Sequence, residues 1–105
     1  MSRQKLFRKM QNAVCSVSTG DAGRNDYYET VGHAISAVDY KLLEFEHRID
    51  PTDWCVQANG RNFSDPDGCR IVVEVTDCDG RHECDAVLSF YRMQSGRYEL
   101  TAYLA

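Results

Sequence analysis

The alternation of apolar and polar residues between positions 69 and 104 is the feature that most restricts the fold of this 105-residue chain. Side chains of a strand point to alternate faces, so a run with a period of two indicates a strand with one buried face. Three such runs, CRIVVEVTD, CDAVLSFYRM and YELTAYL, follow one another with short glycine-bearing segments between them. We therefore expect three consecutive antiparallel strands, at about 69–78, 81–93 and 97–104.

The register of these strands follows from turn composition and from the apolar pattern. A two-residue Asp79-Gly80 turn, which suits the type I′ geometry, would place Val75 opposite Cys84. The same register pairs core-facing residues with one another: Val73 with Ala86, Ile71 with Leu88 and Cys69 with Phe90. A three-residue loop at 94–96 that ends in glycine extends this pairing to the third run.

Apolar residues before position 50 recur with the period of a helix, about 100° per residue. This periodicity predicts helices at about 3–17 and 27–49. Pro51 would stop the second helix, and the WCVQA run behind it predicts one more strand at about 54–58. Another interpretation makes the end of the second helix an alternating strand, formed by Leu43, Phe45, His47 and Ile49. It accounts only for the last turns of the pattern, so we place it second.

These elements predict a single α+β domain, residues 1–105, in which two N-terminal helices pack on one face of a four-stranded antiparallel β-meander. A chain of this length can bury one core. No apolar run approaches the roughly eighteen residues of a membrane-spanning helix. The basic start MSRQKLFRKMQNAV lacks the apolar core of a secretory signal. We therefore expect a soluble, cytoplasmic protein.

Charge is distributed unevenly along the chain. Four of the twelve bases, Arg3, Lys5, Arg8 and Lys9, lie in the first fourteen residues, which hold no acid. The other 91 residues carry eight bases against sixteen acids. Because an acidic surface repels phosphate backbones, direct binding to nucleic acid is disfavoured, and we expect no membrane binding. The expected partner is a basic protein.

The segment VTDCDGRHECDA concentrates side chains that could bind metal or form a disulfide. The predicted register turns Cys78 outward, opposite Arg81, and Cys84 inward, and it places His82 opposite Asp77. A disulfide or a zinc site needs side chains that converge, so we expect a hairpin turn here, with no metal and no cofactor. The five cysteines are odd in number and irregular in spacing, which indicates reduced thiols.

The outer face of the predicted sheet carries opposed acids. Glu74 would lie opposite Asp85, and Thr76 opposite Glu83. Like charges in this position weaken a sheet. They either keep a solvated face from pairing with other sheets or form a patch, bordered by valine and tyrosine, that docks on a cationic surface. We prefer the second interpretation, with partner-binding residues Glu74, Asp79, Glu83, Asp85, Tyr91 and Tyr103.

Motifs for catalysis or metal binding are incomplete. HECDA lacks the second histidine of a zinc-protease helix, and SDPDGCRIVVE matches a calcium loop at only some offsets. His33, Tyr40 and His47 would form a row on the second helix. Successive members would be about 10.5 Å apart, too far to share a metal ion or a proton. We assign no catalytic residue.

These observations favour a small non-enzymatic interaction or inhibitor protein that binds a basic surface of its partner, such as a nucleic-acid-binding surface that it masks. Small phage-encoded inhibitors of host defence, including anti-CRISPR proteins, are similar in size and charge, which is an analogy without a shared motif. One alternative is a small enzyme or ligand-binding domain, with a cleft between the helices and the sheet that holds a thiol and His33 or His82. Another is a subunit that self-associates through the last strand, at the edge of the sheet.

Overall fold

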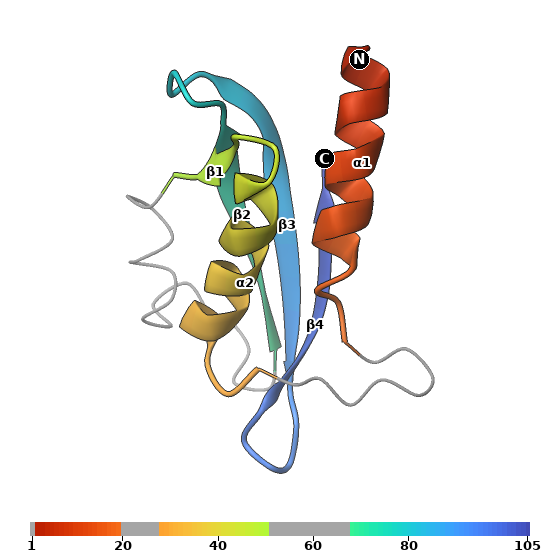
Figure 1. The fold of residues 1–105 in the computed structure, drawn as a ribbon. Helices are drawn as coiled ribbons and strands as arrows, with labels where there is room; N and C mark the ends of the chain where they lie inside the picture. The colour runs from red at the N-terminus through yellow and green to blue at the C-terminus, as the bar shows by residue number, and fades with distance from the viewer. Residues whose placement is uncertain (1, 20–27, 51–67) are drawn as a thin grey trace.

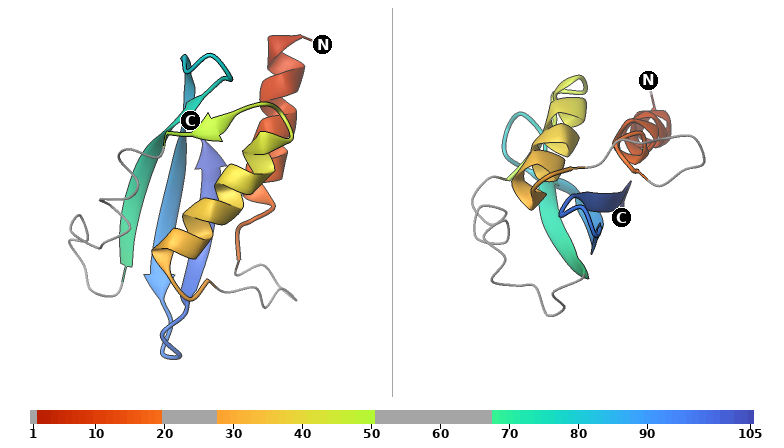
Figure 2. Two further views of the ribbon diagram at one scale, coloured as in Figure 1. Left: turned by 60° about the vertical axis from the view of Figure 1, so that its left-hand side comes forward. Right: turned by 90° about the horizontal axis from the view of Figure 1, so that it is seen from below.

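The computed structural model describes residues 2–19, 28–50 and 68–105 and confirms the α+β fold. Two helices lie on one face of a curled four-stranded antiparallel sheet (Figure 1), and the view from below shows both helices on the same side of it (Figure 2). The strand order is β1-β2-β3-β4. The elements are α1 (Arg3–Cys15), α2 (Val31–Leu43), β1 (Arg48–Ile49), β2 (Gly68–Thr76), β3 (His82–Arg92) and β4 (Tyr98–Leu104). Within the described ranges, no helix combines the length and apolar character needed to cross a membrane.

Both helices begin at a hydroxyl-bearing residue that accepts a backbone hydrogen bond. Ser2 Oγ accepts the N–H of Lys5 at 3.2 Å, and Thr30 Oγ1 accepts the N–H of His33 at 3.1 Å. These caps satisfy donors that the first helical turn leaves free. The sheet side of each helix supplies the core, which also takes in the inward residues of β2, β3 and β4.

α2 is shorter than the helix predicted at 27–49. The helix begins at Val31 and ends at Leu43, after which Glu46 adopts a left-handed φ of 58°. The N–H of His47 then reaches back to the carbonyl of Leu42 at 3.1 Å, as in a Schellman-type helix end. The apolar period continued to Ile49 because residues after the helix still face the core, although their backbone is no longer helical.

The first strand of the sheet is formed by Arg48 and Ile49, which pair with Thr76 and Val75. The strand interpretation that we placed second is therefore right for these two residues and wrong for the helical Leu43. The strand predicted at 54–58 lies outside the described residues.

The predicted register is confirmed along most of both hairpins. β2 pairs Ile71 with Leu88 and Val75 with Cys84, and β4 places Leu100 opposite Phe90. The loop at 94–96 is also confirmed, with Gly96 at a φ of 88°. Positive φ is a conformation that glycine adopts without strain, so this residue type fits the loop position.

The first hairpin differs from the prediction near its turn. The ladder shifts after Val75, so that Thr76 pairs with His82 and not with Glu83. The carboxylate of Asp77 accepts the N–H groups of Asp79 at 2.9 Å and Arg81 at 3.0 Å, which favours a wider turn than Asp79-Gly80 alone. The predicted pairs Asp77–His82 and Cys78–Arg81 are wrong for the same reason.

Side chains from the N-terminal part of the chain cap the outer edge of β4. The amide of Gln11 on α1 accepts the N–H of Leu104 at 2.6 Å and donates to its carbonyl at 3.2 Å. The hydroxyl of Ser18 makes the same pair of contacts with Ala102, at 2.9 and 3.3 Å. Each side chain thus occupies both backbone groups of one edge residue, as a neighbouring strand would.

The remaining edge residues of β4 are bonded as well. Thr19 Oγ1 accepts a hydrogen bond from the N–H of Leu100, and the N–H of Thr19 donates one to the Leu100 carbonyl. Both bonds are 2.7 Å long. Tyr28 and Tyr98 exchange two backbone hydrogen bonds, at 3.0 and 2.5 Å. An added strand at this edge would have to displace these contacts. Self-association through β4 stays an untested expectation.

Candidate functional site

The outer face of the sheet carries two of the acidic residues that the sequence predicted as partner-binding, Glu74 and Asp85. Glu74 on β2 and Asp85 on β3 are direct cross-strand partners, as predicted. Asp79 is exposed in the adjoining turn. Cross-strand partners have Cβ atoms about 5 Å apart, so two carboxylates lie side by side on this face. We call Glu74, Asp79 and Asp85 the acidic face.

The side chain of His82 partly offsets the negative charge of the acidic face. His82 Nε2 lies 2.9 Å from Asp85 Oδ1, and both side chains are about half exposed. This hydrogen bond raises the pKa of His82 above 6.5, and the charges of Asp85 and Glu74 act in the same direction. The positive charge beside Glu74 therefore grows as the pH falls, so the net charge of the face depends on pH.

Glu83 does not belong to the acidic face. Its carboxylate accepts a hydrogen bond from the Arg3 guanidinium of α1 at 2.9 Å, on the helix side of the sheet. The reason is the irregular pairing at the start of β3, which breaks the strict alternation assumed from the sequence. Among the predicted partner-binding residues, Glu83 is therefore the one that the predicted register put on the wrong face of the sheet.

Apolar and aromatic side chains border the acidic face. Val72 is 46% exposed and Tyr91 is 59% exposed, whereas Val87 between β2 and β4 is only 3% exposed. Tyr103 is half-buried, and its hydroxyl accepts a hydrogen bond from Arg70 at 3.2 Å. The outer face thus combines carboxylates with a partly exposed apolar strip.

The row of aromatic and histidine side chains predicted on α2 is only partly present. Tyr40 is 69% exposed and His33 is exposed. His47 lies beyond the helix and is buried, with Nδ1 2.6 Å from the Phe45 carbonyl oxygen. These three side chains therefore do not share one surface.

The cysteines that the structure describes have different surroundings. Cys15 and Cys78 are exposed, and Cys84 is buried. Burial, followed by the charges of Asp85 and Glu83, raises the pKa of Cys84 to about 11, which leaves its thiol protonated at neutral pH. In the described ranges, no three His, Cys, Asp or Glu side chains are grouped as metal ligands.

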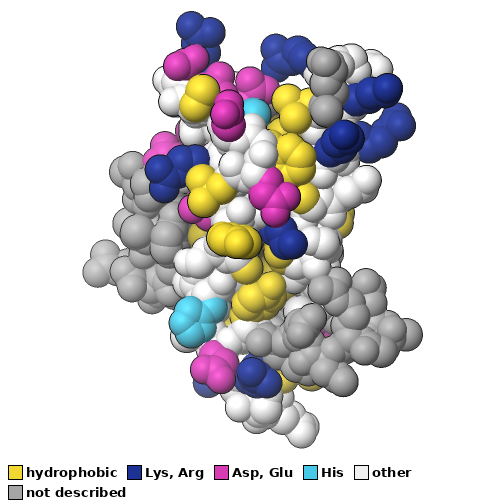
Figure 3. All heavy atoms as spheres, in the orientation of Figure 1, with side chains coloured by type: hydrophobic (Ala, Val, Ile, Leu, Met, Phe, Trp, Pro, Cys, Tyr) yellow, Lys and Arg dark blue, Asp and Glu magenta, His cyan; other side chains and the backbone are white. Residues whose placement is uncertain are grey.

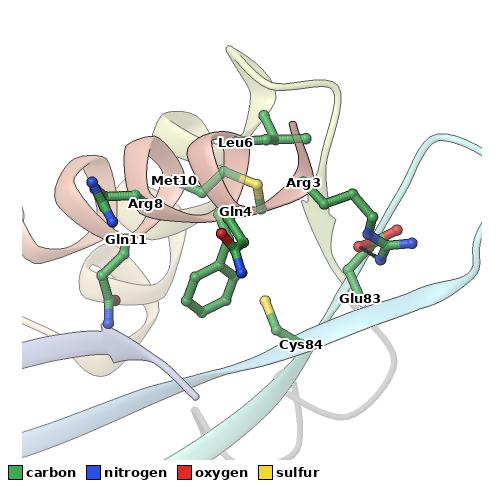
Figure 4. Close-up of a pocket in the computed structure, with 9 residues that line it drawn as sticks. Arg3, Gln4, Leu6, Arg8, Met10, Gln11, Glu83 and Cys84 are labelled. Carbon is green, nitrogen blue, oxygen red and sulfur yellow. Dashed lines mark hydrogen bonds and ion pairs between the residues drawn. The ribbon is translucent and has the colours of Figure 1, made fainter. Parts of the chain in front are cut away.

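A groove lies between the first turns of α1 and the start of β3. Like the cleft of the alternative interpretation it contains a thiol, that of Cys84, but neither His33 nor His82 lines it. Its volume is about 620 Å³. In Figure 4, Met10 and Gln4 from α1 stand above Cys84, with Arg3 at one end and Arg8 at the other. Figure 3 shows hydrophobic side chains in the strip between the two helices and Lys and Arg side chains over α1. The only sequence signal was apolar Leu6 and Phe7 beside basic residues.

The groove lies beside the first residues of β3, before the pairing of this strand with β4 begins. Pairing with β4 ends at Ala86 and Leu104, followed by backbone bonds between Asp85 and Ala105 at 2.8 and 3.1 Å. The first residues of β3 continue past this point beside α1. No pattern within one segment could reveal a space that forms between α1 and β3.

Comparison of the chain with protein-family models, with curated proteins and with solved structures found no match.

Proposed function

We propose that this chain is a small non-enzymatic binding protein whose acidic face docks on a basic surface of a partner protein. One observation carries the proposal: Glu74 and Asp85 lie directly opposite each other on a face that also exposes Val72 and Tyr91. Opposed carboxylates weaken the isolated sheet, and a cation of the partner would relieve their repulsion. The aromatic and aliphatic neighbours supply apolar contact area.

A basic surface that binds nucleic acid is the most concrete partner for this face. Arginine and lysine on such a surface bind phosphate oxygens, and carboxylates can occupy the same side chains. The chain would then act as an inhibitor that masks the surface. The analogy in size and charge with phage-encoded inhibitors of host defence, such as anti-CRISPR proteins, is consistent with this role and does not carry it.

A non-enzymatic role agrees with the state of the buried thiol. Cys84 is protonated at neutral pH, and a thiol is a much weaker nucleophile than a thiolate. Among the described residues, no hydrogen bond joins a cysteine to a histidine. His82 instead bonds to Asp85 at the surface.

The test is affinity capture of a partner from the native host, followed by binding measurements with the purified partner. The double variant Glu74→Lys and Asp85→Lys should lose at least about tenfold in affinity, because two attractive contacts become repulsive. The matched control is Glu29→Lys with Glu44→Lys, which makes the same charge change at exposed positions flanking α2. If both variants keep the partner equally well, the acidic face is not the binding surface.

A further inference from the structure

The groove beside α1 has an apolar floor and a cation, Arg8, that is not paired with any of the described residues, and neither takes part in the function proposed above. We propose that it binds an apolar organic anion, a molecule with a hydrocarbon body and a single carboxylate. The volume of about 620 Å³ falls within the range of about 300–1,000 Å³ that is usual for small-molecule sites.

The apolar body of the ligand fits the floor and one wall of the groove. Leu6, Phe7 and Met10 line it from α1, and Cys84 lines it from β3. Phe7 is 41% exposed, so a large aromatic ring remains accessible at the groove. The thiol of Cys84 carries no charge at neutral pH, which keeps this floor apolar. A hydrocarbon chain bound here removes apolar surface of both the ligand and the protein from water.

The charges of the groove favour an anionic head group. Arg3 and Glu83 neutralise each other through their contact at 2.9 Å. Arg8, which also lines the groove, has no ion pair or side-chain hydrogen bond with any residue that the structure describes. Its guanidinium can hold a carboxylate through two parallel hydrogen bonds. Lys5 and Lys9 on the same helix add a positive potential that attracts anions.

The start of β3 favours a small molecule over an extended peptide as the occupant. A peptide that adds to a sheet edge needs a regular row of backbone donors and acceptors. The pairing of β3 is irregular at its start: Val75 pairs with Cys84, but the next residue, Thr76, pairs with His82, so Glu83 has no partner residue in β2. The amide of Gln11 is already bonded to Leu104. A hydrocarbon body needs neither a regular row of backbone donors and acceptors nor the amide of Gln11.

The test uses sodium dodecanoate, below the concentration at which it forms micelles, and protein labelled with ¹³C in the methionine methyl groups. Met10 lines the groove, whereas Met93 lies at the far hairpin and serves as an internal control. We expect the Met10 methyl resonance to shift with saturation at one equivalent, while that of Met93 stays unchanged. Dodecylamine should bind at least about tenfold more weakly, because its head group is repelled by Arg8.

A pair of variants on α1 separates a site from general adsorption. Arg8→Gln should weaken dodecanoate binding about threefold to tenfold, since it removes the charged hydrogen-bond donor. Lys9→Gln makes the same charge change on the same helix outside the groove and should alter the affinity less than about twofold. Equal shifts at Met10 and Met93, equal binding by the two variants, or equal binding of the amine would each overturn the proposal.

Discussion

At the scale of single residues, Glu46 is the clearest case of local strain. It is the one non-glycine residue with positive φ in the ranges that the structure describes. Glu46→Gly should raise the free energy of unfolding by about 0.5–1 kcal/mol, because the left-handed conformation costs a side-chain-bearing residue more than glycine loses in entropy. Urea denaturation measures this change. Glu44→Gly, at a right-handed position, should instead lower the stability, and a loss with Glu46→Gly as well would contradict the assignment.

His82 and Asp85 give a second prediction at this scale. The hydrogen bond raises the pKa of His82, so its contribution to stability is fully present below the unfolded pKa of about 6.5 and is lost as the pH rises through the folded value. Asp85→Asn should return the His82 pKa toward 6.5, as measured by NMR titration of the imidazole protons. An unchanged His82 pKa in the variant would show that the bond is absent in solution.

At the scale of elements, α1 acts on the sheet through its polar side chains as well as its apolar face. Gln11→Leu keeps the size of the side chain but leaves the N–H and C=O of Leu104 without their partner. The free energy of unfolding should fall by about 1–3 kcal/mol, as expected for unsatisfied backbone groups. Denaturation in urea provides the value. Gln4→Leu on the same helix should change it by less than about 0.5 kcal/mol.

The same pair of variants tests the role of the capped edge. An exposed strand edge is a template for pairing with other chains. Gln11→Leu should therefore increase concentration-dependent association in light scattering, whereas Gln4→Leu should not. Equal behaviour of the two proteins would mean that the contact with Leu104 does not protect the edge.

The elements also show what sequence patterns can predict. Alternation predicted most of both hairpin registers, because a slip of one residue would have moved every core side chain to the solvent, and turn composition predicted the loop of the second hairpin. The predicted end of α2 was wrong. Apolar residues spaced three and four apart show which side chains face the core, but they do not show whether the backbone that bears them is still helical. The bulge before Cys84 was missed because the hydrogen bonds of Asp77 decide the turn and are not visible in the apolar pattern.

At the scale of the whole molecule, the bases of α1 and the opposed carboxylates of the acidic face lie on opposite sides of the sheet. The bases of α1 lie on the helix side (Figure 3), whereas Glu74 and Asp85 lie on the outer face of the sheet. The acidic face was therefore predictable from register and charge together, except for Glu83. The groove was not, because it forms from α1 and β3, whose closest lining residues are far apart in the chain.

The capped β4 edge has a kinetic consequence. The contacts that Gln11, Ser18 and Thr19 make with it join residues separated by 81 to 93 positions, so they form only after distant segments have come together. Loops of this length close late, and chains dominated by distant contacts fold slowly. We expect the folding protein to pass through a stage in which the hairpins have formed and their outermost strand is still open to other chains.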